Sequence, residues 1–70
     1  GLYHELKSWR LSESQRLNCP PYYVFNDRTL DELCSVLPSN FEELQEVSGF
    51  GPVKVKRFGK DIVRIVMENC

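Results

Sequence analysis

The sequence predicts an all-α fold, a compact bundle of about five short helices. Apolar residues recur at steps of three and four along most of the chain, which is the period of an amphipathic helix. Prolines and glycines divide these periodic stretches into short segments. The one candidate strand, PPYYVF, is too short and too rich in proline to be reliable. With 70 residues, the chain has room for one small domain, expected over residues 1–70.

The first helix is predicted over about residues 2–17. Apolar residues follow helical spacing from Leu2 to Trp9, and the segment contains no proline. Asn18 can cap the C-terminal end, and the proline pair that starts at Pro20 prevents the helix from continuing. We expect Trp9 to be a core residue of this helix.

The second helix is expected after a short connector. The stretch Pro20–Phe25 predicts an extended or single-turn link that places aromatic side chains on the core. Asn26 or Asp27 then caps the helix, and Pro38 ends it. The residues expected on its buried face are Leu30, Leu33, Cys34 and Leu37.

Two more helical patterns complete the chain. The Ser-x-x-Glu spacing from Ser39 to Glu42 is typical of a capping box and predicts a short third helix. Its expected buried residues are Phe41, Leu44 and Val47. The last pattern begins at Pro52, which suits the first turn of a helix, and runs to Val66. Gly59 lies inside it, so we expect a bend or a division near that residue.

The formal net charge of −1 hides an asymmetry. Residues 1–48 hold four basic and eight acidic residues, a net charge of −4. Residues 49–70 hold five basic and two acidic residues, a net charge of +3. A split of this kind suggests a local anionic partner rather than a generally basic binder.

The basic region begins at the stretch VSGFGPVKVKR. Gly49 and Gly51 can simply permit positive φ angles between two packed helices, with Phe50 as a core residue. They can also let a phosphate approach the free N–H groups of the next helix, although Pro52 removes one donor. No Gly-Lys-Ser or Gly-Lys-Thr follows and no strand precedes the stretch, so ATP is not expected here.

Four basic side chains follow the glycines, and each can neutralise a backbone phosphate. Lys56 and Lys60 are four residues apart and share one helix face, while Lys54 and Arg57 share another. The alternative is a solvated face with no binding role. The clustering of positive charge at one end of an otherwise acidic chain favours binding.

No catalytic or metal-binding constellation is evident. The cysteines, Cys19, Cys34 and Cys70, are odd in number, widely spaced and without a Cys-x-x-Cys pair. This pattern argues against a disulfide framework and a zinc site, and it favours a reduced, intracellular setting. No serine has a histidine plausibly placed to activate it, so no enzymatic activity and no cofactor are expected. No apolar run is long enough to span a bilayer.

Short motifs follow one another in a fixed order over residues 2–69. They are Leu6-x-x-Trp9-Arg10, Pro20-Pro21-Tyr22-x-Val24-Phe25, Asp27-x-Thr29-Leu30 and Val47-x-Gly49-Phe50-Gly51-x-x-Lys54-x-x-Arg57-Phe58-Gly59. Together they resemble the HRDC domain, the helicase-and-RNase-D C-terminal module, and most of all the version in RecQ-family DNA helicases. The sequence departs from the usual pattern at Ser14 and Cys19, where apolar residues are more common.

The resemblance implies a five-helix accessory module, cut from a larger helicase whose ATPase lies in other domains. Such modules bind single-stranded or branched DNA weakly, and some make protein contacts instead. The resemblance also implies a bacterial cytoplasm or nucleoid, or a eukaryotic nucleus, as the location. By the resemblance, Tyr22 falls near the DNA-binding face, and Lys54, Arg57 and Lys60 fall within a basic surface.

The predicted function is therefore weak binding of single-stranded or structured DNA by a monomer, without strong sequence preference. The predicted nucleic-acid-binding residues are Tyr22, Gly49, Gly51, Lys54, Lys56, Arg57 and Lys60. Tyr22 and Tyr23 are expected to point in different directions, one to the core and one to a base. Arg10 is expected to pair with an acidic residue rather than to reach a phosphate.

Two alternative functions remain open. The first is docking to the helicase core or to another protein through the acidic side chains Asp31, Glu32, Glu42, Glu43 and Glu46. The second is a helix-hairpin-helix clamp for duplex DNA built on VSGFGPVK. An RNase D parent, with RNA as the substrate, is also open, although PPYYVF favours RecQ.

Overall fold

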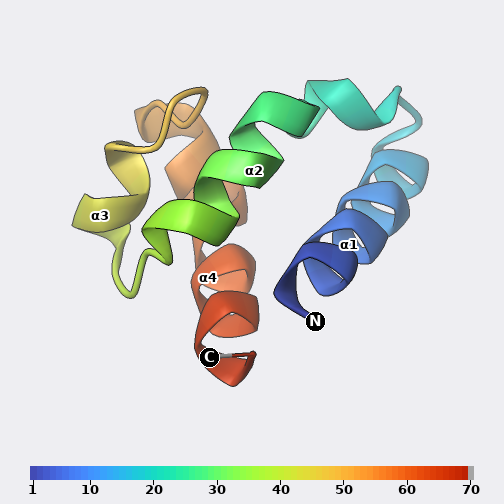
Figure 1. Cartoon of the computed structure of the whole chain (residues 1–70). Helices are drawn as coiled ribbons and strands as arrows, with labels where there is room; N and C mark the ends of the chain where they lie inside the picture. The colour runs from blue at the N-terminus through green and yellow to red at the C-terminus, as the bar shows by residue number, and fades with distance from the viewer. Residues whose placement is uncertain (70) are drawn as a thin grey trace.

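The computed structural model describes residues 1–69, and in this range it contains helices and turns but no strand. The elements are α1 (Leu2–Leu17), the 3-10 turn η1 (Pro21–Tyr23), α2 (Asp27–Val36), α3 (Phe41–Gln45) and α4 (Pro52–Glu68). The predicted all-α class is confirmed. In Figure 1, α2 lies between α1 and α3, and the start of α1 and the end of α4 lie at the same side of the molecule.

Helix α1 has the predicted bounds. Asn18 adopts a left-handed conformation with φ of 57°, and its N–H donates to the carbonyls of Ser14 and Gln15. A left-handed residue at this point satisfies carbonyls that would otherwise lack partners and turns the chain away from the helix axis. Arg16, in the last turn, pairs with Glu13 at 2.7 Å.

Helix α1 attaches to the core through Leu6 and Trp9. Leu6 is fully buried, and the half-buried Trp9 packs against the core cluster. The Trp9 ring stacks on Phe25 at a centroid distance of 6.3 Å and meets Phe58 edge-on at 5.8 Å. Trp9 therefore joins α1 to both the connector and α4, as expected of a core residue.

The connector forms the single turn η1 and then delivers two side chains to the core. The N–H groups of Tyr23 and Val24 donate to the carbonyls of Pro20 and Pro21 at 3.0 Å. Val24 and Phe25 are buried, whereas both tyrosines are exposed. Of the two predicted alternatives for the connector, an extended link or a single turn, the structure therefore has the single turn, with the tight winding of a 3-10 helix.

Helix α2 begins as predicted at an Asn26 cap, whose Oδ1 accepts from the Thr29 N–H at 2.8 Å. Leu30 and Leu33 are fully buried. The prediction for Leu37 is wrong, because this residue ends the helix in a left-handed conformation with φ of 54° and its side chain is 43% exposed. Because Leu37 lies outside the helix, its side chain does not reach the buried face that helical spacing predicted for it.

The start of α3 lies one residue away from the predicted capping box. Asn40, not Ser39, is the cap, and its Oδ1 accepts from the Glu43 N–H at 2.8 Å. The Glu43 carboxylate in turn accepts from the N–H and the hydroxyl of Ser39. This register makes Phe41 the first helical residue, and its side chain is 51% exposed instead of buried. Leu44 is buried as predicted.

Helix α4 is continuous, so the predicted bend or division at Gly59 is wrong. It starts with Pro52 in the first turn and covers 17 residues. A Cβ on Gly59 would lie 3.3 Å from side-chain atoms of Phe41, Leu44 and Val55. Gly59 therefore permits close packing of α3 on α4, and the cost of a glycine within the helix is about 1 kcal/mol.

No helix within residues 1–69 is long and apolar enough to cross a membrane. Over the same range, no group of three or more His, Cys, Asp and Glu side chains is placed to hold a metal ion. Cys19 and Cys34 are free thiols and half-buried, with Cys34 packed against the core. Burial and the nearby charge of Asp31 raise the pKa of the Cys34 thiol. Cys70 lies outside the described residues.

Candidate nucleic-acid interface

The glycine turn before α4 is fastened to α2 by two hydrogen bonds. The Thr29 hydroxyl donates to the Ser48 carbonyl at 2.8 Å, and the Ser48 N–H donates to Glu32 at 2.6 Å. Gly49 has φ of +92°, and a Cβ there would lie 2.5 Å from the Thr29 hydroxyl oxygen. Phe50 is buried. The prediction that Gly49 permits a positive φ between two packed helices and that Phe50 is a core residue is therefore confirmed.

Gly51 has a different environment from Gly49. Its backbone is extended, with φ of −85°, and no atom lies within 4 Å of the position that a Cβ would take. It caps α4 without a side-chain hydrogen bond, and the first intrahelical bond runs from the Val55 N–H to the Gly51 carbonyl at 3.1 Å. The N–H groups of Val53 and Lys54 lack intrahelical partners in this geometry. They are open to an acceptor at the positive end of the helix dipole.

Lys54 and Arg57 line one surface groove together with Tyr23. This Lys54 groove has a volume of about 410 Å³, and its lining residues are Leu17, Cys19, Tyr23, Val53, Lys54, Arg57 and Phe58. Its floor is apolar and its two charged residues are basic. The groove thus combines a phenol ring with two positive charges, drawn from η1 and from the first turns of α4.

The charges of the basic residues are available for a ligand. Among residues 1–69, no ion pair involves the four basic residues that follow the glycines, Lys54, Lys56, Arg57 and Lys60. The Arg57 guanidinium carbon lies 5.3 Å from the Phe58 ring centroid, which restrains the side chain without neutralising it. A hydrogen bond from Arg16 lowers the pKa of Glu13, and the Arg57 charge adds to this effect.

Tyr22 lines a second groove, which has no lining residue in common with the Lys54 groove. This Arg28 groove has a volume of about 550 Å³, and its lining residues are Arg10, Pro21, Tyr22, Asn26, Asp27 and Arg28. Arg10 is nearly buried there and bonds the Phe25 carbonyl at 3.0 Å and Asp27 at 2.9 Å. The predicted pairing of Arg10 with an acidic residue is confirmed.

The two tyrosines lie against each other, so the prediction that they point in different directions is wrong. Their ring centroids are 5.2 Å apart, the interplanar angle is 24°, and the exposed fractions are 63% for Tyr22 and 62% for Tyr23. Val24 and Phe25 supply the core contacts that one tyrosine was expected to make. Both rings are consequently left at the surface.

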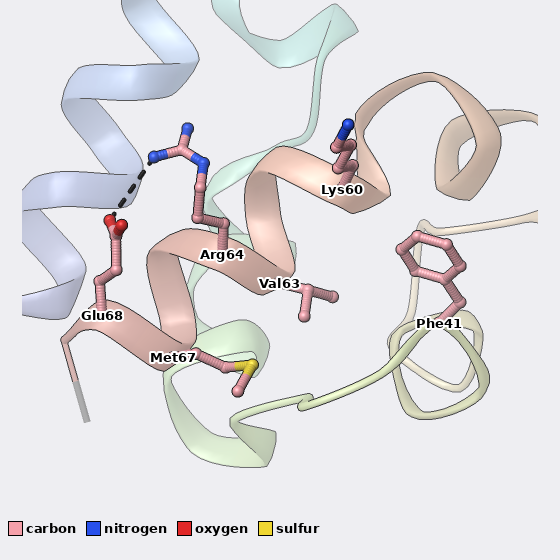
Figure 2. Close-up of a pocket in the computed structure, with 6 residues that line it drawn as sticks. All are labelled: Phe41, Lys60, Val63, Arg64, Met67 and Glu68. Carbon is pink, nitrogen blue, oxygen red and sulfur yellow. Dashed lines mark hydrogen bonds and ion pairs between the residues drawn. The ribbon is translucent and has the colours of Figure 1, made fainter.

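Lys56 and Lys60 lie outside the Lys54 groove. Lys60 borders a third groove of about 440 Å³, the Phe41 groove, which is lined by Phe41, Lys60, Val63, Arg64, Met67 and Glu68. In Figure 2, Val63 and Met67 lie on the side of α4 toward Phe41, whereas Arg64 and Glu68 pair with each other. Of the seven predicted binding residues, Lys54 and Arg57 therefore share one groove, while Tyr22 and Lys60 each line a different one.

Neither Arg28 nor Tyr23 was among the residues that the sequence predicted to bind nucleic acid. Arg28 belongs to the acidic part of the chain, so the charge totals gave no reason to select it. The fold brings it to the same groove as Tyr22. The useful signal in the sequence was the pair of adjacent tyrosines after two prolines, since a tight turn can expose both rings.

The comparisons with known proteins agree on one family. A model of the HRDC domain matches residues 1–66. The chain is 34% identical over 68 residues to the ATP-dependent DNA helicase RecQ of Haemophilus influenzae, covering 97% of this chain and 11% of that protein. It is 39% identical over 62 residues to the ATP-dependent DNA helicase UvrD2 of Mycobacterium tuberculosis, covering 89% and 9%.

A nuclease relative is also similar. The Ribonuclease D of Pseudomonas paraeruginosa is 28% identical over 68 residues, covering 97% of this chain and 18% of that protein. The chain thus spans between 9% and 18% of the length of these three curated relatives.

Proposed function

Since the chain belongs to the HRDC domain family, we propose that it is an accessory nucleic-acid-binding module of a RecQ-like DNA helicase. It binds single-stranded or branched DNA weakly and without strong sequence preference. The relatives named as ATP-dependent DNA helicases are about ten times longer than this chain. We assign ATP hydrolysis and strand separation to other parts of such a parent, and no cofactor to this domain.

One observation carries the proposal: Tyr23, Lys54 and Arg57 line a single groove. A basic groove with an aromatic wall suits a single strand, because lysine and arginine contact phosphates while the ring stacks on a base. Stacking tolerates any base, since every base has a π-face. This chemistry supports binding without strong sequence preference.

The start of α4 supports the same proposal. The N–H groups of Val53 and Lys54 and the open space at Gly51 allow a phosphate oxygen to approach the backbone. The Lys54 side chain leaves the same turn. We therefore propose Gly51 as a phosphate contact, and we assign Gly49 mainly to the turn itself. Lys56 and Lys60 add long-range attraction from outside the groove.

The test is a titration of the chain with fluorescently labelled single-stranded DNA, followed by anisotropy at several salt concentrations. We expect the logarithm of the association constant to fall linearly with the logarithm of salt, with a slope of about −0.7 for each phosphate contacted. The variant Lys54→Gln with Arg57→Gln should lose most of the binding. Absence of binding at low salt, or full binding by this double variant, contradicts the proposal.

Arg64→Gln with Lys7→Gln is the matched control for the double variant. It removes the same amount of positive charge, but neither residue lines the Lys54 groove or the Arg28 groove. A loss of binding equal to that of Lys54→Gln with Arg57→Gln would show that only net charge matters. The groove would then have no specific role.

A second candidate function is protein docking, and the Phe41 groove is the observation that favours it. Phe41 is 51% and Met67 61% exposed around Val63, so the surface between α3 and α4 is apolar (Figure 2). Exposed apolar surface of this kind often marks an interaction site. The exposed acidic residues Glu42 and Glu46 lie on or next to α3. They favour a partner with basic residues beside an apolar anchor, such as a segment of the helicase core.

Backbone chemical-shift mapping separates the two candidates. Docking predicts that the purified helicase core perturbs α3 and the second half of α4, with no change in η1. DNA binding predicts changes in η1 and in the first turns of α4. Phe41→Ser should abolish the first pattern and leave the second intact.

A further inference from the structure

The Lys54 groove and the Arg28 groove share one aromatic wall. Tyr23 lines the first groove and Tyr22 lines the second, and the two rings stack on each other. Each tyrosine therefore covers one face of its neighbour and leaves its own outer face uncovered by the other. The pair is a partition between two grooves, with one ring belonging to each side.

The Arg28 groove carries its own uncompensated positive charge. Arg10 and Asp27 bond each other at 2.9 Å, so their charges offset. Arg28 is exposed and belongs to no ion pair within residues 1–69. It lines this groove together with Tyr22, as Lys54 and Arg57 line the other groove together with Tyr23. Each groove thus pairs one phenol ring with at least one free cation.

We propose that a single strand crosses the tyrosine partition and occupies both grooves, with Arg28 as a phosphate-binding residue of the second groove. This inference rests on the proposed function and extends it. One base stacks on the outer face of Tyr23, another base of the same strand stacks on Tyr22, and the backbone passes over the two rings. Arg28, from the acidic half of the chain, then acts together with the basic residues of α4.

The arrangement selects single strands. Bases on opposite sides of the stacked rings are unstacked from each other, and paired bases within a duplex cannot separate in this way without losing their own stacking. A flexible strand makes the crossing at little cost, and a pyrimidine strand at the least, because its bases stack weakly in solution. The same geometry sets a minimum length, since a strand too short to pass the partition fills one groove only.

The inference is tested with labelled oligothymidine of increasing length, from about 2 to about 20 nucleotides, which brackets the roughly 4–16 nucleotides that a single-strand-binding OB fold covers. Binding is followed by anisotropy for the unmodified chain, Arg28→Gln, Lys54→Gln and Arg64→Gln. Arg64→Gln is the matched control, because it removes an exposed arginine that lines the Phe41 groove and neither of the two grooves under test.

We expect Arg28→Gln to lower the affinity for long oligonucleotides and to make the salt slope shallower by about 0.7, the loss of one phosphate contact. The shortest oligonucleotides should bind this variant and the unmodified chain equally, whereas Lys54→Gln should weaken binding at every length. Arg64→Gln should leave the slope unchanged. A duplex of the same length should bind more weakly than the single strand.

Each contrary outcome has a distinct meaning. If Lys54→Gln weakens binding but Arg28→Gln matches Arg64→Gln at every length, the proposed function stands and the two-groove path is wrong. If duplex and single strand bind equally well, the path is also wrong. If the unmodified chain binds no oligonucleotide at low salt, both the path and the proposed function are wrong.

Discussion

The Thr29 hydroxyl oxygen lies 2.5 Å from the position that a Cβ on Gly49 would occupy. The same hydroxyl donates to the Ser48 carbonyl, so it cannot move without breaking a partly buried hydrogen bond. Gly49 also has φ of +92°, which side-chain-bearing residues rarely adopt. Two independent constraints thus require glycine at one end of the turn, and neither of them applies to Gly51.

Gly49→Ala is therefore expected to lower the free energy of unfolding by at least about 2 kcal/mol, from backbone strain together with the displaced Thr29. Gly51→Ala should change it by less than about 0.5 kcal/mol, since its backbone suits alanine and the space is open. Urea denaturation of the two variants measures this difference. Equal destabilisation would mean that the turn is tolerant at Gly49.

Gly51→Ala has a separate effect on binding if a phosphate lies against the α4 N-terminus. The added methyl group occupies the space that the phosphate oxygen needs, so affinity for single-stranded DNA should fall while the fold remains intact. Anisotropy titration beside a circular dichroism spectrum gives both readings. Unchanged affinity in a folded Gly51→Ala variant would remove Gly51 from the site.

Arg10 holds the connector to α1, and its replacement should be costly. Its guanidinium bonds the Phe25 carbonyl and Asp27, and its side chain is only 8% exposed. Arg10→Ala leaves the buried carbonyl without a donor, which is expected to cost about 2–3 kcal/mol in denaturation experiments. Arg16→Ala is the matched control, because its pair with Glu13 is at the surface and is worth less than about 1 kcal/mol. Equal losses in the two variants would contradict a structural role for Arg10.

The stability of α3 should depend on pH through Glu43. Hydrogen bonds from the Ser39 N–H, and then from its hydroxyl, lower the pKa of this carboxyl below the ordinary value of 4.5. A lowered folded-state pKa stabilises the fold above the ordinary value, and the contribution is lost as pH falls through the folded-state pKa. Glu43→Gln should therefore be less stable than the unmodified chain at about pH 7 and equally stable at about pH 2.

Thermal melts of Glu43→Gln across this range check the prediction. Glu42→Gln serves as the control, since Glu42 is an exposed carboxylate in the same first turn of α3, and Ser39 bonds Glu43 instead. A difference between Glu43→Gln and the unmodified chain that persists unchanged at low pH would point to a cause other than the carboxylate.

The stacked tyrosines should contribute to binding as a coupled pair. Tyr22→Ala and Tyr23→Ala are each expected to weaken single-stranded DNA binding by about 1–3 kcal/mol, the usual contribution of one stacked base. Because each ring supports the other, the losses should not add in the double variant. Tyr22→Phe and Tyr23→Phe keep the rings and should bind normally. Additive losses would indicate two independent rings.

Much of the fold was predictable because local chemistry decides it. The end of α1 at Asn18, the Asn26 cap and Pro52 at the start of α4 follow from single-residue preferences. Gly59 shows where such preferences fail, since its packing against side chains of α3 outweighs its low helix propensity. The prediction that Phe41 is buried was wrong for a related reason, because a shift of one residue in the cap changes which face of a short helix is buried.

The candidate site was less predictable than the fold. The sequence indicated basic residues and one tyrosine, and it could not show which of them meet. Tyr23 and Arg28 line the two grooves because of how η1 and α2 pack, which depends on contacts distant in sequence such as Arg10 with Phe25. The sequence did place Lys56 and Lys60 on a different helix face from Lys54 and Arg57, and the structure puts Lys54 and Arg57 in one groove and Lys60 at another.

The unbroken α4 also fixes a distance. A helix of 17 residues is about 25 Å long, and here one end begins at the Lys54 groove while the other borders the Phe41 groove. If DNA and a protein were bound at these two grooves at the same time, their separation and relative orientation would be set by the continuous helix α4. The domain would then act as a spacer of constant length between a strand and a neighbouring protein.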